Sequence, residues 1–332
     1  MLSTVNDDSS SSAFSDCNSD RSGEFPTASW ESRRRLLVAC TDDCIRQMVL
    51  NLESSSIEDR KQATMEIRLL AKNKQENRLK IARAGAIKPL ISLISSADLE
   101  LQEYAVTAVL NLSLCDENKE VMASSGAVRP LVGALERGTP TAKENAACAL
   151  VRLSQREEQK VAIGRAGAIP ALVRLLEGGG VRGKKDAATA LYSLCLAGEN
   201  RARAVRAGAV RALVELMAEL RLGVAEKAAY VASVVVMSAE GREAVVEEGG
   251  IPVLVEMVEV GTQRQKEIAV GVLLQICQES VVYRLMVSRE GAIPPLVSFS
   301  HSHANKKAEK LIELLRQPRS ANVTCRTSQI SA

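Results

Sequence analysis

The 332-residue chain is poor in aromatic residues, with one tryptophan, four tyrosines and three phenylalanines, or 2% of the sequence. So few rings provide no platform for stacking bases, and there is no dense basic stripe, so we expect no nucleic-acid partner. Charged residues interrupt every apolar run before the ~18 residues needed to span a membrane, so no membrane span is expected. The only two histidines occur in the segment His301-Ser302-His303, a predicted loop, and the sequence places no catalytic nucleophile against them. We therefore expect no catalytic residues, no cofactor and no small-molecule substrate.

The eight cysteines do not form a metal-binding or disulfide pattern. Half of them lie in or beside apolar stretches, where cysteine acts as a small core residue: Cys115, Cys148, Cys195 and Cys277. Cys40 and Cys44 are spaced to share a helix face, but both histidines are far away in the sequence, so we expect no zinc site. The N-terminus does not resemble a secretory signal, which predicts reduced thiols and a cytoplasmic and/or nuclear protein.

The formal net charge of +3 hides a division along the chain. Residues 1–32 contain six acids and one base, Arg21, and therefore carry −5, which leaves +8 for the remainder. That charge is mild over 300 residues and indicates a solvated surface, with acidic partners as the alternative. Residues 1–32 are rich in serine and aspartate and are predicted to be disordered, and residues 317–332 are predicted to form a flexible basic tail.

What the chain does have is a phrase, Gly-Ala-Ile or a close variant, that occurs six times. Its glycines are 41, 41, 41, 41 and 42 residues apart: Gly85, Gly126, Gly167, Gly208, Gly249 and Gly291. A fixed period in this range is typical of stacked repeats, in which each unit buries its apolar face against a neighbour. Function is therefore expected on a long surface rather than in a pocket.

Each repeat divides into three predicted helices, as the second one illustrates. The first helix covers about Asn118–Ser124 and stops before Gly126, a residue suited to ending a helix in a left-handed turn. The second helix starts at Val128, with a proline in its first turn. The third helix is predicted to have Thr141 as its N-cap, with a glutamate three residues later, and to run to about Gln155.

Two rows of third-helix positions recur across the repeats and are predicted to face inward. One row is small: Ala105, Ala146, Ala187, Ala228 and Ala269. The other is aliphatic: Leu112, Leu153, Leu194, Val235 and Ile276. Small residues allow neighbouring helices to approach closely, and each buried aliphatic side chain contributes ~1.5–3 kcal/mol.

These three-helix units, with a glycine at the same junction, resemble the armadillo repeat. Three segments look like the armadillo region of plant U-box ubiquitin ligases: 66–72 (EIRLLAK), 108–113 (AVLNLS) and 161–169 (VAIGRAGAI). The resemblance covers residues from about 45 to 316 and ends in a closing helix over 305–316. It implies an all-α fold, a right-handed superhelical armadillo solenoid of about six to seven three-helix repeats, within a domain spanning residues 33–316.

In the U-box ligases, the U-box lies before the armadillo repeats and recruits the ubiquitin-conjugating enzyme. Only about 32 residues precede the repeats here, and a compact domain of that size usually needs disulfides, a metal or a partner. We therefore expect a U-box relative without its U-box, a non-enzymatic scaffold or adaptor for proteins in ubiquitin-linked or signalling complexes. The alternatives are a substrate-recognising component of an E3 ubiquitin ligase and a nuclear-import adaptor.

The resemblance also implies a groove along the third helices that binds an extended peptide or helix of a partner protein. In nuclear-import adaptors this groove carries a ladder of tryptophan and asparagine. The matching tryptophan positions are Thr107, Cys148, Thr189, Tyr230 and Gly271. The matching asparagine positions are Asn111, Arg152, Ser193, Val234 and Gln275. With one asparagine and no tryptophan kept, recognition of basic localisation peptides loses its mechanism.

The residues predicted to line the groove carry mixed charges and polar groups: Glu103, Thr107, Asn111, Glu144, Arg152, Lys185, Ser193, Tyr230 and Gln275. In the functional interpretation, Asn111, Arg152, Ser193 and Gln275 hydrogen-bond to the backbone of a partner. The alternative is a solvated helix surface with occasional ion pairs, each of which contributes little to stability.

A last row is basic in all six units, just inside the first helix: Arg78, Lys119, Lys160, Arg201, Arg242 and Arg284. A cation near a helix start is slightly unfavourable with respect to the helix dipole, so its repetition needs a reason. We expect each base to pair with an acid of a neighbouring repeat, and the alternative is a row that binds a partner.

Overall fold

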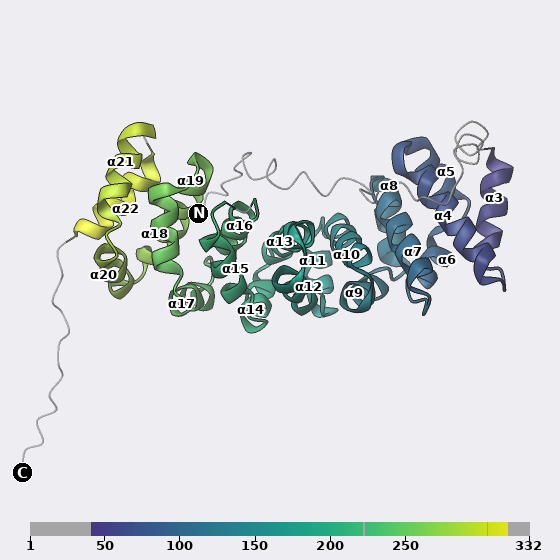
Figure 1. Ribbon diagram of the computed structural model, residues 1–332, viewed down its shortest axis with the longest axis horizontal. Helices are drawn as coiled ribbons and strands as arrows, with labels where there is room; N and C mark the ends of the chain where they lie inside the picture. Colours follow the sequence, from purple (N-terminus) through teal and green to yellow (C-terminus); the bar gives the residue numbers. More distant parts are fainter. Residues whose placement is uncertain (1–40, 222, 304, 318–332) are drawn as a thin grey trace, which may run out of the picture. The chain divides into compact units, whose positions relative to one another are not determined.

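The computed structural model describes residues 41–317, apart from 222 and 304. These residues form twenty α-helices and no strand (Figure 1), so the predicted all-α class is confirmed. Residues 1–32, which are predicted to be disordered, lie outside the described residues. The predicted flexible tail, residues 317–332, also lies outside them apart from its first residue. The chain divides into two compact units, Met1–Gly250 and Ile251–Ala332.

In the first unit, a helix pair is followed by helices in groups of three, here called the first, second and third helix of each group. The pair is α3 (Asp42–Asn51) and α4 (Ile57–Asn73). The first helices are α5 (Gln75–Arg83), α8 (Asp116–Ser124), α11 (Glu157–Arg165), α14 (Gly198–Arg206) and α17 (Ala239–Glu247). The second helices are α6 (Ile87–Leu93), α9 (Val128–Arg137), α12 (Ala168–Gly178) and α15 (Ala209–Ala218). The third helices are α7 (Leu99–Leu112), α10 (Pro140–Leu153), α13 (Val181–Cys195) and α16 (Ala225–Val235).

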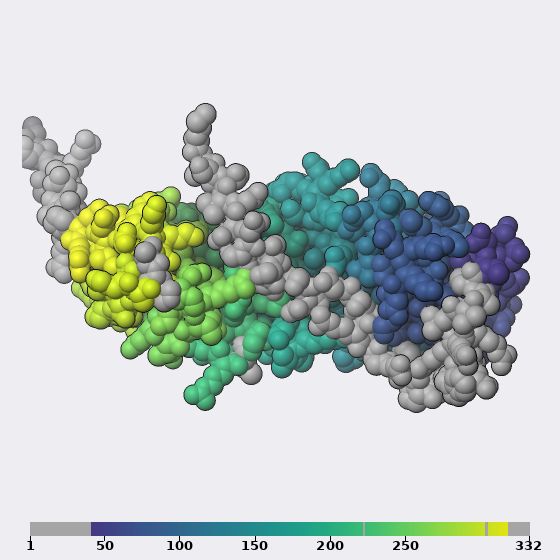
Figure 2. All heavy atoms as spheres, turned by 90° about the horizontal axis from the view of Figure 1, so that it is seen from above, coloured from purple at the N-terminus to yellow at the C-terminus, as the bar shows by residue number. Residues whose placement is uncertain are grey.

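Helices of the same kind pack against one another in order along the first unit. Helices α4, α7, α10, α13 and α16 form one such series of neighbours. The second helices α9, α12 and α15 form another series of neighbours, and the first helices α11, α14 and α17 form a third series. Figure 2 shows these elements, coloured from purple to green, packed side by side. Each group therefore buries its apolar face against the next, as expected for stacked repeats.

The junction glycine of every group has a left-handed backbone. The φ values of the six glycines run from 74° to 91°. No heavy atom would lie within 4 Å of a Cβ added at any of them, so crowding does not explain the glycines. The positive φ, which side chains disfavour, explains why the phrase repeats.

The third helix α10 begins two residues earlier than the sequence predicts. The prediction that Thr141 is the N-cap is wrong, because Thr139 holds that position and its Oγ1 accepts a hydrogen bond from the Ala142 amide at 3.1 Å. Pro140 then occupies the first helical position. A proline is well placed there because its missing N–H would have had no partner in the helix.

The two inward rows are buried, as predicted. All five alanines of the small row have no exposed surface, and the aliphatic row is at most 2% exposed. The four cysteines in the apolar stretches are buried and form no disulfide with a described residue. The core therefore lies between the third helices and the helices that precede them.

The second unit contains five helices. They are α18 (Gly250–Val260), α19 (Gln263–Gln278), α20 (Val281–Arg289), α21 (Ile293–His303) and α22 (Lys306–Arg316). Helix α22 packs against α19, α20 and α21, and it is the predicted closing helix. Asn305 caps its start, since Oδ1 accepts hydrogen bonds from the Lys307 and Ala308 amides. The predicted loop around His301 is wrong, because His301 lies in α21 and its Nδ1 is 2.7 Å from the Val297 oxygen.

Candidate partner-binding face

Eight of the nine predicted groove residues lie on the third helices of the first unit. They are Glu103, Thr107 and Asn111 on α7, Glu144 and Arg152 on α10, Lys185 and Ser193 on α13, and Tyr230 on α16. We call this set the third-helix face. Gln275 lies on α19 of the second unit, where it is half-buried.

Burial divides these residues into two classes. Thr107 and Asn111 have no exposed surface, and Tyr230 is 8% exposed. The other five residues of the third-helix face are half-buried. Asn111 Nδ2 donates a hydrogen bond of 3.1 Å to the Arg68 oxygen on α4. The side-chain amide of Asn111 thus joins α7 to its neighbour α4.

A chain of polar contacts crosses α7, α10 and α13. Asn145 Nδ2 donates to Thr107 Oγ1 at 2.9 Å, and Arg182 Nη2 donates to Asn145 Oδ1 at 2.9 Å. Arg182 Nε is also 3.3 Å from Glu144 Oε2 and 3.5 Å from Asp186 Oδ2. Three consecutive third helices are therefore linked through side chains at the edge of the core.

A second set of contacts continues the pattern toward α16. Lys227 Nζ donates to Thr189 Oγ1 at 3.5 Å. The rings of Tyr192 and Tyr230 meet edge to face, with centroids 6.2 Å apart. The Ser193 hydroxyl is 2.8 Å from that of Ser154. Of the predicted residues, Ser193 and Tyr230 thus each contact a neighbouring group.

Burial controls the electrostatics of this face. Desolvation raises the pKa of Glu144 above its ordinary value, although the nearby Arg182 guanidinium acts in the opposite direction. Glu103 accepts a hydrogen bond from the Thr139 hydroxyl on the loop before α10. The face thus offers fixed donors and carboxylates in a partly dry setting, where hydrogen bonds and ion pairs are stronger than in water.

The sequence prediction missed Asn145, Asp186 and Lys227, which are at most 6% exposed. They occupy one aligned position, immediately after the predicted row that contains Glu144 and Lys185. The signal was available, since a polar residue at a 41-residue spacing among inward positions indicates a buried polar ladder. Its partners were not readable, because they lie on neighbouring helices.

The basic row has a role that neither sequence interpretation gave. Four arginines donate to carbonyl oxygens at the end of the preceding helix: Arg78 to Ala71 at 2.7 Å, Arg201 to Cys195 at 3.0 Å, Arg242 to Val236 at 3.1 Å and Arg284 to Cys277 at 2.7 Å. These contacts are with backbone carbonyls, where the sequence led us to expect an acid of a neighbouring repeat. Lys119 pairs with Asp116 of its own helix, at 2.5 Å.

Helix ends explain this arrangement. The last carbonyl groups of a helix have no partner within the helix, and a cation is favourable at that end of the dipole. The forked guanidinium reaches two carbonyls at once, as Arg201 does with Cys195 and Leu196. Each of the four arginines thus caps the carbonyl end of the helix before it. This favourable contact compensates for the unfavourable position of its charge near the start of its own helix.

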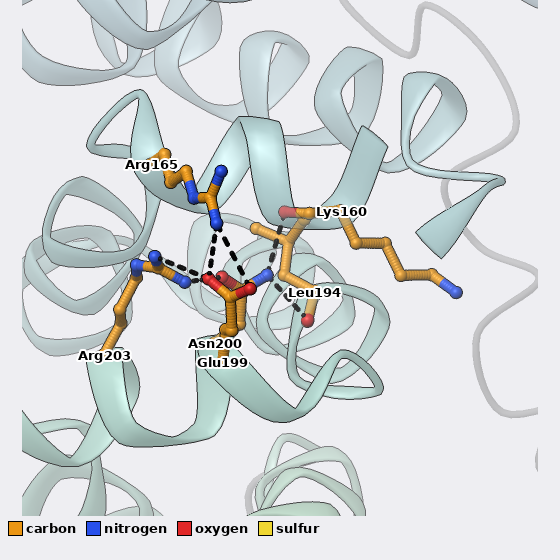
Figure 3. A network of polar contacts seen from close by, with 6 residues as sticks. All are labelled: Lys160, Arg165, Leu194, Glu199, Asn200 and Arg203. Atoms are coloured by element: carbon orange, nitrogen blue, oxygen red, sulfur yellow. Dashed lines mark hydrogen bonds and ion pairs between the residues drawn. The ribbon is translucent and has the colours of Figure 1, made fainter. Parts of the chain in front are cut away.

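A separate polar cluster joins α11 to α14 (Figure 3). Arg165 Nη2 on α11 is 3.0 Å from Glu199 Oε2 on α14, and Arg203 Nη2 is 3.1 Å from the same oxygen. These hydrogen bonds, from Arg203 and Arg165, hold the pKa of Glu199 below its ordinary value. Beneath them, Asn200 Nδ2 donates to the Lys160 oxygen at 2.8 Å and the Leu194 oxygen at 2.9 Å. This cluster is an inter-repeat seam.

Two of the buried cysteines are poor nucleophiles. Burial raises the pKa of the Cys195 thiol, and likewise that of Cys277, to about 12. Thiols in that state do not act as nucleophiles near neutral pH. Within residues 41–317, no group of histidine, cysteine and acidic side chains could hold a metal ion, and no helix has the length and apolar content to cross a membrane.

Comparison with solved structures supports the armadillo fold. An engineered protein of known crystal structure has a TM-score of 0.75 and 26% sequence identity, with 82% of this chain and 68% of that chain covered. A structure solved in work on the interaction between cadherin and β-catenin has a TM-score of 0.74. Its 18% identity, over 85% of this chain and 56% of that one, supports the fold alone.

Curated relatives match more closely over shorter stretches. U-box domain-containing protein 4 of Arabidopsis thaliana is 47% identical over 86 residues, 26% of this chain and 10% of that protein. U-box domain-containing protein 10 of the same plant is 54% identical over 71 residues, 21% of this chain and 11% of that protein. E3 ubiquitin-protein ligase SPL11 of Oryza sativa subsp. japonica is 49% identical over 73 residues, 22% and 10% of the respective chains. The chain thus aligns with about a tenth of each relative's length.

The family model described as the plant U-box protein ARM repeat region matches residues 44–328. That match covers most of the chain, and it concerns a repeat region rather than a catalytic domain. The chain belongs to the plant U-box protein ARM repeat family.

Proposed function

We propose that this chain is a non-enzymatic scaffold or adaptor that binds partner proteins across the third-helix face. The observation that carries the proposal is the contact chain from Thr107 through Asn145 to Arg182, which crosses three consecutive third helices. Backbone groups inside helices are already hydrogen-bonded, so recognition here depends on side chains. Thr107 and Asn145 are themselves buried, so a ligand that runs along the row would meet the half-buried side chains beside them, Glu144, Arg152 and Lys185.

The ligand that fits best is an extended peptide or a helix of a partner. Neighbouring helices pack about 8–10 Å apart, so an extended segment meets a new third helix roughly every three residues. The half-buried charges change sign along the row, from Glu103 and Glu144 to Lys185. This order favours a segment of mixed charge over a uniformly basic one, and so disfavours the nuclear-import role.

The names of the relatives favour ubiquitin-linked complexes over other signalling complexes, since they describe U-box proteins and one E3 ubiquitin-protein ligase. We place these complexes in the cytoplasm and/or nucleus. Substrate recognition within an E3 ligase is the alternative role, and it would use the same face. The enzymatic version of that role predicts self-ubiquitination by the purified chain when activating and conjugating enzymes are supplied.

Charge reversal on the third-helix face tests the proposal. The variant combines Arg152→Glu with Lys185→Glu, and the matched control is Lys88→Glu on the second helix α6, where the side chain is exposed. Affinity capture from plant extract, with mass spectrometry, should show a set of partners that the control retains and the double variant loses. Thermal denaturation checks that all three proteins are folded.

Two outcomes count against the proposal. If the double variant keeps every partner while remaining folded, the third-helix face is not the binding surface. If the purified chain ubiquitinates itself, the non-enzymatic assignment is wrong.

A further inference from the structure

A hollow of about 480 Å³ lies in the first unit between the α6–α7 connection and helix α9. We call it the α7–α9 hollow. Its lining contains apolar, polar and basic side chains, among them Ile94, Leu99, Gln102, Arg129, Gly133 and Arg137. Two of the lining residues are arginines and none is an acid. The chemistry of this wall is therefore that of a site for a negatively charged ligand.

The two arginines lie on one face of α9. Arg129, Gly133 and Arg137 are spaced four residues apart, so they stack along the helix. Arg137 Nη2 is 3.1 Å from the point that a Cβ of residue 133 would occupy. The absence of a side chain at Gly133 therefore lets the Arg137 guanidinium lie along the helix, toward its N-terminus, at the hollow.

This arrangement is specific to α9 among the second helices of the first unit. The aligned triplets are Lys88, Ser92 and Ser96 in the α6 group, Pro170, Arg174 and Gly178 in α12, and Arg211, Glu215 and Glu219 in the α15 group. None of them has two arginines on either side of a glycine. The repeat scaffold does not require the triplet in α9, so the triplet calls for a local explanation.

Gln102 lines the hollow from α7 but offers no accessible polar group to a ligand. The residue is 8% exposed and lines the hollow. Its Nε2 donates to the Ile94 oxygen at 2.9 Å, but its Oε1 has no hydrogen-bond partner among the described residues. A buried acceptor without a donor is costly, and such groups are rare in folded proteins. That oxygen has almost no accessible surface and lies 3.0 Å from the point that a Cβ of residue 138 would occupy, so a ligand in the hollow does not reach it.

Neighbouring charges leave the hollow basic. Glu136 Oε2 is 3.3 Å from Arg137 Nη1, but that arginine side chain is 76% exposed, so the pair is weak. Arg129 forms no ion pair with any described residue. Arg129 also borders a second hollow, of about 550 Å³, whose wall includes Glu157, Glu158 and Glu199. An acidic ligand is repelled from that second hollow, so the α7–α9 hollow is the one suited to it.

We propose that the α7–α9 hollow binds an extended acidic peptide. Its carboxylates pair with Arg129 and Arg137. Eight residues of α9 rise about 12 Å, the length of roughly four residues of extended chain. Alternate residues of such a chain share a face, so acids at every second position meet both arginines. The site uses no residue of the third-helix face, so it stands independently of the proposed function.

Fluorescence anisotropy of the full chain tests the proposal. The probe is a labelled nine-residue peptide with glutamate at every second position and valine between, and glutamine replaces glutamate in its matched control. Combining Arg129→Gln with Arg137→Gln should weaken binding about tenfold or more, since both charge-assisted contacts are lost. Gly133→Ala should weaken it about threefold, because the added methyl group displaces only the flexible end of Arg137. Arg211→Gln, at the position of α15 aligned with Arg129, should leave binding within about twofold.

Three results would overturn the proposal: no binding of the glutamate peptide, equal binding of the glutamine peptide, or equal loss in the Arg211→Gln control. Circular dichroism of each variant establishes that it is folded.

Discussion

The α11–α14 seam and the α14–α17 seam are neighbours in the first unit, and each covers the carbonyl end of a third helix in a different way. In the seam between α11 and α14, Asn200 reaches the Leu194 oxygen with its side chain at 2.9 Å. In the seam between α14 and α17, the aligned residue is Gly241, and the aligned carbonyl belongs to Val235. A Cβ at Gly241 would lie 2.1 Å from that oxygen. One seam satisfies the end of a third helix with an amide, and the other brings the backbone itself so close that no side chain fits.

The position aligned with Gly164 also differs between the two helices. Gly164 on α11 faces Asn200, since a Cβ there would lie 2.0 Å from Asn200 Oδ1. The aligned residue on α14 is Val205. The two aligned positions are therefore glycine and asparagine in the first seam, and valine and glycine in the second.

The largest expected effect is that of Gly241→Ala. The new methyl group would overlap the Val235 oxygen and carbonyl carbon, which are backbone atoms of the end of α16 and cannot rotate away. Overpacking of this kind should lower the free energy of unfolding by about 3 kcal/mol or more. Urea denaturation followed by far-UV circular dichroism measures the change.

Gly198→Ala is the matched control for that variant. Gly198 begins α14, and no heavy atom lies within 4 Å of the point that a Cβ there would occupy. This variant should stay within about 0.5 kcal/mol of the parent. If the two substitutions had equal effects, close approach at Gly241 would not be what distinguishes the two seams.

A smaller effect is expected for Gly164→Ala in the other seam. Here the methyl group meets the end of the Asn200 side chain, which can rotate away but then loses its bonds to the Lys160 and Leu194 oxygens. The expected loss is about 1–2 kcal/mol, because two buried carbonyl groups lose a donor.

A double-mutant cycle with Asn200→Ala isolates this contact. Once residue 200 is alanine, the Gly164→Ala substitution should cost less than about 0.5 kcal/mol, since the clash is gone and alanine favours the helix. Additive losses in the double variant would mean that Gly164 is required for a reason other than Asn200.

The fold was predictable because it depends on features that repeat within the sequence. The period of Gly126 and its equivalents, and the alanine row that contains Ala146, reflect backbone geometry and burial that act in each unit separately. The N-cap of α10 was misplaced by two residues, because both Thr139 and Thr141 have a suitable side chain. The position of Pro140 between them was the deciding local signal.

The site was less predictable, because its contacts join different helices. Whether Asn111 faces solvent or the Arg68 oxygen depends on how α7 is rotated against α4, which the sequence of either helix does not specify. The contacts of the basic row were not predictable for a related reason. The partners of Arg201 are backbone carbonyls, and a backbone acceptor leaves no mark in the sequence.

The smallest expected effect concerns pH and again separates the two seams. Arg203 and Arg165 lower the pKa of Glu199 in the folded chain, so the ionised carboxylate stabilises the fold at pH values above the ordinary glutamate pKa of about 4.3. As pH falls through the lowered folded-state pKa, the carboxylate is protonated and that stabilisation is lost. The stability difference between the parent and Glu199→Gln should therefore be present near pH 7 and shrink in acid. Because Glu199 is half-exposed, about 1 M salt should also reduce it.

Glu240→Gln is the control in the α14–α17 seam. Glu240 is aligned with Glu199, is exposed, and has no ion pair with any described residue. Its replacement should change stability little at any pH, because the α17 position aligned with Arg203 is Ala244. A pH-dependent loss of the same size in both variants would assign the effect to the general charge of the chain. A loss confined to Glu199→Gln would show that the α11–α14 seam carries an electrostatic contact that its neighbour replaces by close packing.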